Sequence, residues 1–143
     1  MIGAYVAIAG AWIALEAAWT VPEVPEPRTL ALPTGLVLFA TQAATLAVHA
    51  RGSAIGAVIL VGGIALRLWA IRTLGDAFAT AIAPRRIVRT GPYRWLRHPS
   101  ELGLVLAAAG GAVWLGSALG LAVAALLVPL SIVRARRENA AIA

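Results

Sequence analysis

Three groups of polar residues interrupt an otherwise apolar chain, and they contain the candidate catalytic and ligand-binding residues. The first is the segment 83–101, which contains five arginines, His98 and Glu101. The second is the segment 134–139, with Arg134 and Glu138, and the third is Glu16, alone in the first apolar run. Guanidinium groups, an imidazole and carboxylates gathered at one site would suit a zwitterionic ligand that carries a carboxylate and an ammonium group.

The residue pair His98-Pro99 adds a second element to such a site. Proline is favoured at the first position of a helix, where its missing N–H group costs nothing. A helix that begins at Pro99 would place its unpaired first-turn N–H groups near His98, and such groups attract anions. The sequence therefore predicts an anion-binding helix start beside an imidazole.

Each residue also has a plainer interpretation when it is taken alone. Arginines next to apolar runs are typical anchors on the cytoplasmic side of a membrane, and Tyr93 and Trp95 fit an interfacial aromatic belt. Glu16 would be paired with another group or would reach toward the nearby interface. The functional interpretation therefore depends on whether the fold brings the first two polar groups together.

The residue types exclude several kinds of site. The chain has no cysteine, so it has no disulfide framework, thiolate nucleophile or cysteine-based metal site. Its only histidines are His49 and His98, which argues against a multi-histidine metal site, and we expect no metal.

The composition is that of a membrane protein. Apolar residues make up 61% of the 143 positions and charged residues 13%, against about 45–50% and about 25% in typical soluble domains. The formal net charge is +6, and every positive side chain is an arginine. These arginines cluster between apolar runs instead of forming a long basic tract, so we expect a membrane partner and no nucleic acid.

The apolar runs predict an all-α integral membrane protein with about five transmembrane helices. Three spans are expected at about 2–21, 30–50 and 54–71, with a proline-rich link at 22–28. The charge-free run 102–133 would be about 48 Å long as one helix, too long for a hydrocarbon core of about 30 Å, so it must fold back as a tight helical hairpin. Gly110-Gly111 and Gly116-Ser117 are the available turns, and the second is favoured; Pro129 should kink the last helix.

The single predicted domain, 1–143, therefore has four parts. Residues 1–73 are expected to form three N-terminal spans, 74–101 a cytoplasmic connector, 102–133 the hairpin and 134–143 a cytoplasmic tail. Seven arginines between Arg67 and Arg97, and three in the tail, predict that the connector and tail face the cytoplasm of a multi-pass inner-membrane protein, with the N-terminus outside. The N-terminus has no positively charged lead, so the first run is expected to stay in the protein.

A hairpin that enters and leaves at one membrane face would bring the connector and tail together. His98 and Glu138, forty residues apart, would then be neighbours in space. Arg134 and Glu138 stand four residues apart and would share one face of a continuing helix. The predicted site thus combines an imidazole, a guanidinium and a carboxylate at the cytoplasmic end of the helices.

A family resemblance adds to these expectations. Residues 90–100 read TGPYRWLRHPS, residues 74–78 read LGDAF, and after the hydrophobic hairpin residues 134–139 read RARREN. This arrangement resembles the isoprenylcysteine carboxyl methyltransferase family, in a superfamily that includes phospholipid N-methyltransferases and bacterial alkylpyrone O-methyltransferases. The likeness runs from Leu74 to the C-terminus.

The resemblance implies an S-adenosylmethionine-dependent methyltransferase. Its acceptor would be a lipid or prenylated small molecule, methylated on a carboxylate or a hydroxyl of an isoprenoid, alkylpyrone or other lipid. Arg134 would face the acceptor as a catalytic residue, with His98 as a candidate base. The implied cofactor-binding residues are Arg85, Arg86, Ile87, Val88, Tyr93, His98, Pro99, Ser100, Glu101 and Glu138.

The sequence departs from the family pattern at Glu101, where the family usually has tyrosine. The segment after Glu138 is short and looks closest to the alkylpyrone branch. Two other functions stay open. Sterol reductases, which use NADPH, share a similar Arg-His-Pro string, and a membrane protein that binds a ligand without turning it over would also fit.

Overall fold

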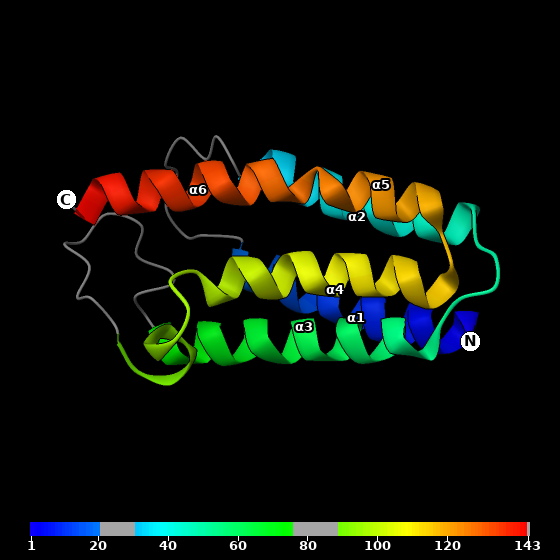
Figure 1. The fold of residues 1–143 in the computed structure, drawn as a ribbon, viewed down its shortest axis with the longest axis horizontal. Helices are drawn as coiled ribbons and strands as arrows, with labels where there is room; N and C mark the ends of the chain where they lie inside the picture. The colour runs from blue at the N-terminus through cyan, green and yellow to red at the C-terminus, as the bar shows by residue number, and fades with distance from the viewer. Residues whose placement is uncertain (21–30, 76–88, 143) are drawn as a thin grey trace.

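The computed structural model describes residues 1–20, 31–75 and 89–142 (Figure 1). These residues form helices only, so the predicted all-α class is confirmed for them. In chain order the elements are α1 (Ile2–Thr20), α2 (Ala31–Ala47), α3 (Ala54–Leu74), the 3₁₀ helix η2 (Gly91–Arg94), α4 (Pro99–Leu115), α5 (Ala118–Ala125) and α6 (Leu127–Ile142).

Two of the helical stretches are long and apolar enough to cross a membrane. They are Ala54–Leu74 and Ala118–Arg137, whereas the apolar stretches of α1, α2 and α4 are at most 17 residues long. Large apolar side chains such as Phe39 and Val58 are exposed, as lipid-facing side chains would be. The expected count of five spans therefore stays a prediction.

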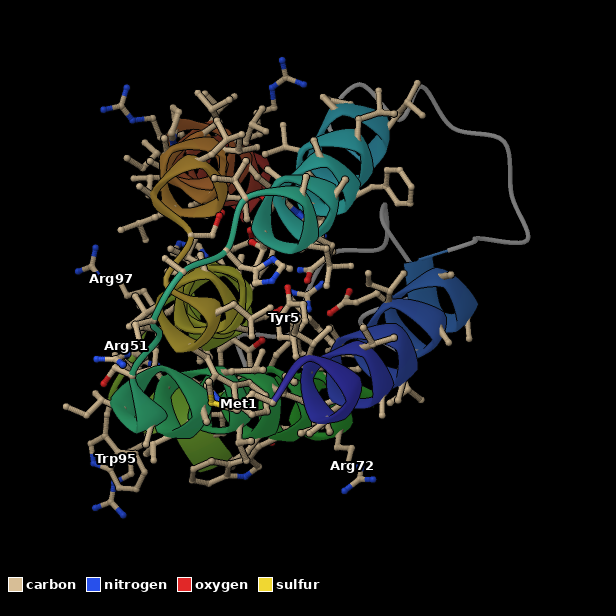
Figure 2. All side chains as sticks on the ribbon, turned by 90° about the vertical axis from the view of Figure 1, so that its right-hand side faces the viewer. Met1, Tyr5, Arg51, Arg72, Trp95 and Arg97 are labelled. Atoms are coloured by element: carbon tan, nitrogen blue, oxygen red, sulfur yellow. The ribbon has the colours of Figure 1, made fainter. Side chains whose placement is uncertain are left out.

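The helices run side by side and alternate in direction (Figure 1). Viewed along the helices, Tyr5 points into the interior, whereas Arg72 and Arg97 point outward (Figure 2). Tyr5 is packed in the core with Trp12, Leu60, Leu104 and other buried side chains from α1, α3 and α4. Its hydroxyl group donates a hydrogen bond to Gln42 Oε1 on α2.

Glycines allow α3 and α4 to lie backbone against backbone. A Cβ atom added at Gly63 would lie 2.8 Å from the Gly103 carbonyl oxygen and 2.9 Å from Ala107 Cα. A Cβ at Gly110 would lie 2.9 Å from Leu60 Cα. Because real Cβ atoms do not approach backbone so closely, the α3–α4 spacing depends on these small residues.

The chain reverses at Gly116-Ser117, the turn that the sequence favoured. Helix α4 ends with Gly116 in the left-handed conformation, at φ 66°. Ser117 then caps α5, its Oγ accepting a hydrogen bond of 3.0 Å from the Gly120 N–H. The α2–α3 loop joins this end, because the Ala50 N–H donates to the Leu115 carbonyl oxygen at 3.0 Å.

The last helical stretch is interrupted at Leu126, between α5 and α6. Pro129 follows three residues later and has no N–H group for the carbonyl of Ala125, so the regular ladder breaks just before it. Helix α4 begins at Pro99, three residues before the charge-free run 102–133 expected to form the hairpin, because proline suits the first helical position. Helix α2 ends at Ala47, three residues before the end of the expected span 30–50.

Candidate active site

One end of the helix bundle gathers most of the predicted functional residues. The C-terminal ends of α1 and α3, the helix η2 and the start of α4 lie at this end, and α6 runs past it to the C-terminus (Figure 1). Segment 89–98 folds back onto α3: a Cβ at Gly91, which has φ 55°, would lie 2.8 Å from Thr73 Oγ1. Glycine is therefore required there for both its conformation and its size.

Aromatic side chains hold this segment against α3. The rings of Trp69 and Trp95 meet edge to face with centroids 6.4 Å apart, and the Arg94 guanidinium lies 5.9 Å from the Trp95 ring centre. Trp95 is 71% exposed and Trp69 49% exposed. Such exposed indole rings are typical of the membrane–water interface, so this end of the bundle fits an interfacial position.

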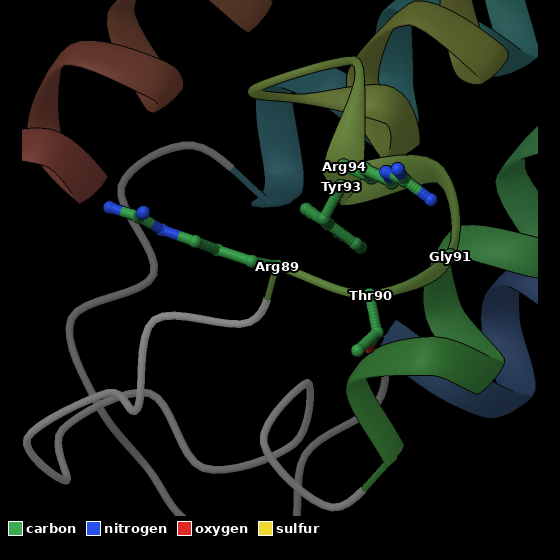
Figure 3. Close-up of a pocket in the computed structure, with 5 residues that line it drawn as sticks. All are labelled: Arg89, Thr90, Gly91, Tyr93 and Arg94. Carbon is green, nitrogen blue, oxygen red and sulfur yellow. The ribbon is translucent and has the colours of Figure 1, made fainter.

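An open hollow of about 740 Å³ lies beside η2. It is lined by Arg89, Thr90, Gly91, Tyr93 and Arg94, all from one short segment (Figure 3). Two guanidinium groups and a tyrosine ring offer attraction for an anionic group and a flat surface for an aromatic one. The hollow thus has the chemistry to hold part of an anionic, aromatic small molecule.

The start of α4 follows directly after this segment. His98 is the N-cap residue and Pro99 occupies the first turn, so the predicted helix start at Pro99 is confirmed. The His98 side chain makes no capping hydrogen bond and is partly buried. The first-turn N–H groups of a helix have no partner within the helix, so this end carries partial positive charge next to the imidazole.

A buried ion pair holds Ser100, the second residue of α4. The Arg67 Nε and Nη2 groups donate to the two carboxylate oxygens of Glu16, the latter at 2.6 Å. Arg67 Nη1 donates to Ser100 Oγ at 2.8 Å and to the Ser100 carbonyl oxygen at 3.1 Å. Trp12 Nε1 donates to Glu16 Oε1 at 3.0 Å. One guanidinium group therefore joins α1, α3 and α4.

A second polar cluster holds the next residue, Glu101. Its Oε2 accepts a hydrogen bond of 2.9 Å from the Ser131 hydroxyl, and its Oε1 lies 3.3 Å from Arg134 Nη1. The Glu101 side chain is 9% exposed and that of Arg134 is 30% exposed. The first turn of α4 is thus held from α1 and α3 at Ser100 and from α6 at Glu101.

Residues 54–143, which include both clusters except Glu16 and Trp12, match the family model of the isoprenylcysteine carboxyl methyltransferase (ICMT) family. The chain belongs to the isoprenylcysteine carboxyl methyltransferase family. No curated protein and no solved structure matches the chain. Membership makes it a membrane protein of a methyltransferase family, and helices α1 and α2 lie outside the matched region.

For this isoprenylcysteine methyltransferase-family chain, the structure places the predicted site residues unevenly. Tyr93 lines the hollow, and His98, Pro99, Ser100 and Glu101 form the start of α4. Residues 85–88 lie outside the described residues, as does the side chain of Glu138 on α6. Arg134 meets Glu101, so the first turn of α4 and helix α6 are neighbours.

Sequence reasoning missed four of the residues around the hollow and the role of Arg67. Arg89, Thr90, Gly91 and Arg94 line the hollow with Tyr93. Glu16 was expected to be paired or to reach the interface, and the structure pairs it with Arg67. The signal in the sequence was that both residues are ionisable and lie inside apolar runs. Burying an ionisable side chain there is costly unless it pairs with an opposite charge.

The Glu101–Arg134 contact should contribute measurably to stability. Replacing Arg134 by glutamine leaves the buried Glu101 carboxylate without its cation, so we expect a loss of about 1–3 kcal/mol in the free energy of unfolding. Arg136 lies on the same helix and is exposed, so Arg136→Gln serves as the matched control. Thermal unfolding in detergent checks this: equal melting temperatures for the two variants would show that the pair does not join α4 to α6.

Proposed function

We propose that this protein is an S-adenosylmethionine-dependent methyltransferase that acts on a lipophilic acceptor at the cytoplasmic face of the inner membrane. Family membership supports methyl transfer in general. The observation that supports the finer proposal is that the hollow lined by residues 89–94 and the helix start at His98-Pro99 lie at the same end of the bundle. That end offers cations, an imidazole and helix N–H groups together.

The donor set fits the cofactor's chemistry. S-adenosylmethionine carries a carboxylate, an ammonium group, an adenosine and a sulfonium. When bound, it would supply the electrophilic methyl group of that sulfonium. Arg89 and Arg94 with the α4 start suit the carboxylate, and the Tyr93 ring suits the adenine. Arg85, Arg86, Ile87, Val88 and Glu138 are assigned to the cofactor by the resemblance alone, Glu138 as the partner of the ammonium group.

The chain's own contribution to methyl transfer is alignment. Displacement at a sulfonium methyl group is in line, so holding donor and acceptor together and excluding water supplies most of the acceleration. Arg134 is assigned to orient the acceptor at the membrane face. A carboxylate acceptor needs no base, whereas a hydroxyl acceptor needs one to take its proton, and His98, Glu101 and Glu138 are the candidates.

Glu101 bears on which acceptor is used. Its carboxylate already lies 3.3 Å from the Arg134 guanidinium, so the positive charge that would attract an anionic lipid is partly compensated. A hydroxyl of an isoprenoid, alkylpyrone or other lipid would not have to compete with Glu101 for that charge. Both the carboxylate and the hydroxyl class remain within the proposal.

The experiment is methyl transfer from S-adenosylmethionine with a labelled methyl group. Purified protein in lipid nanodiscs is incubated with a bacterial lipid extract, and the label is then followed into the organic phase. The proposal predicts enzyme-dependent, lipid-soluble label that is inhibited by S-adenosylhomocysteine. Label that remains entirely in the aqueous phase with every lipid fraction would contradict a lipophilic acceptor.

The proposed orientation has a separate test, since the chain has no cysteine of its own. Thr90 and Ala50 are both exposed and lie near opposite ends of the bundle, so single cysteines there report on the two membrane faces. A membrane-impermeant maleimide should label Thr90→Cys only in inverted vesicles and Ala50→Cys only in intact spheroplasts. The reverse pattern would put the site on the outer face.

A further inference from the structure

The ion pair between Glu16 and Arg67 is costly where it stands. The two residues are 7% and 2% exposed, and both lie in apolar helices. Transferring two charges out of water often costs more than their attraction returns, so a buried ion pair is weak evidence for a role in stability. Ionisable residues inside membrane helices are functional candidates by default.

The position of the pair indicates its role. It lies toward the end of the bundle that carries the hollow, with Glu16 about one turn before the end of α1 and Arg67 about two turns before the end of α3. Through Arg67 Nη1 it holds both the hydroxyl and the carbonyl oxygen of Ser100, two residues after His98. Fixing these two atoms fixes the direction of the first turn of α4, and with it the N–H groups at the helix start.

The geometry requires the two residues as they are. The planar guanidinium group of Arg67 presents two donors to Glu16 and a third to Ser100 at the same time. A lysine ammonium group cannot reproduce this planar arrangement of donors. Both Glu16 oxygens accept hydrogen bonds, so a glutamine there would offer one acceptor too few and would leave the buried cation without its counter-charge.

We propose that Glu16 and Arg67 are positioning residues that orient the α4 start for the cofactor. This inference rests on the proposed function, and it adds a residue from α1, which lies outside the region matched by the family model. Glu16 orients Arg67, Arg67 holds Ser100, and Ser100 fixes the first turn of α4 at the end of the bundle that carries the hollow. Neither Glu16 nor Arg67 is required to touch the ligand.

The deciding variant removes both charges together. Glu16→Leu with Arg67→Met replaces the pair by apolar side chains of similar size, a change that is often neutral or stabilising for the fold. If the pair contributed only to stability, this double variant would change its melting temperature and would bind S-adenosylhomocysteine as tightly as the wild type. A positioning role predicts a folded variant whose dissociation constant is raised about tenfold or more.

A matched control removes a different buried polar contact of α1. Tyr5→Phe with Gln42→Leu deletes the Tyr5–Gln42 hydrogen bond, which joins α1 to α2 and does not touch the start of α4. This control should leave the dissociation constant for S-adenosylhomocysteine unchanged. An equal loss of affinity in the control and in the Glu16/Arg67 double variant would overturn the inference.

Hydrogen exchange on the ligand-free protein separates the inference from the proposed function. In the double variant the hydrogen-bonded amides at the start of α4, beginning with the Leu102 N–H that donates to the His98 carbonyl oxygen, should exchange faster than in the wild type. The amides of α5 should not change. Unchanged exchange at the α4 start, or an unchanged dissociation constant, overturns the positioning role. Wild-type protein that binds no S-adenosylhomocysteine contradicts the proposed function, and the exchange rates alone then decide whether the pair orients α4.

Discussion

Adding a single methyl group at Gly63 is expected to destabilise the protein, whereas the same change at Gly62 is expected to stabilise it slightly. A Cβ at Gly63 would lie within 3 Å of the backbone of α4 at Gly103 and Ala107, so the two helices would have to separate. Overpacking of this kind costs about 1–3 kcal/mol. A Cβ at Gly62 would meet nothing within 4 Å, and alanine favours a helix by about 1 kcal/mol over glycine.

The two alanine variants are a matched pair, because they differ by one position on one helix. Thermal unfolding in the same detergent should give a lower melting temperature for Gly63→Ala and an equal or higher one for Gly62→Ala. The displaced α3 would also disturb Arg67 and Ser100, so Gly63→Ala should weaken cofactor binding as well. Identical shifts for the two variants would mean that α3 and α4 are not in backbone contact.

The second large effect is expected at His98. Its side chain makes no capping hydrogen bond, so His98→Ala removes no cap from α4, and circular dichroism checks that the variant keeps its helix content. Its imidazole lies at the helix start proposed to hold the cofactor, so the dissociation constant for S-adenosylhomocysteine should rise at least about tenfold. Calorimetric titration of the folded variant measures this loss directly.

The other histidine supplies the control. His49 is exposed, its Nδ1 lies 2.9 Å from the Leu46 carbonyl oxygen, and it belongs to the α2–α3 loop at the opposite end of the bundle. His49→Ala should therefore bind S-adenosylhomocysteine like the wild type. If the two variants bound equally well, the assignment of His98 to the cofactor would be wrong.

Much of the helical framework could be predicted from local sequence signals. Length and hydropathy indicated the helices, the Gly-Ser pair in an overlong apolar run indicated the reversal at Gly116-Ser117, and proline indicated the start of α4 at Pro99. The interruption before Pro129 follows from the missing N–H group. These features depend on a few neighbouring residues, which is why the sequence alone reveals them.

The contacts between distant helices could not be predicted in the same way. Neither the pairing of Glu16 with Arg67 nor that of Glu101 with Arg134 follows from hydropathy, because helices that are apolar on all sides leave their rotation and register undefined. The close approach of α3 and α4 depends on which glycines face each other. Gly52 and Gly56 have the four-residue spacing of small residues that lets helices approach closely, and a Cβ at Gly56 would lie 2.6 Å from Trp114 Cα.

The helix start at His98-Pro99 and the hollow lined by residues 89–94 are proposed to bind S-adenosylmethionine together. Titration of the detergent-purified wild-type protein with S-adenosylhomocysteine, with NADPH in a parallel titration, tests it most directly. We expect saturable binding of one S-adenosylhomocysteine per chain and none of NADPH. Absence of S-adenosylhomocysteine binding up to about 1 mM, the upper range of typical enzyme–substrate affinities, or saturable binding of NADPH in its place, would contradict it.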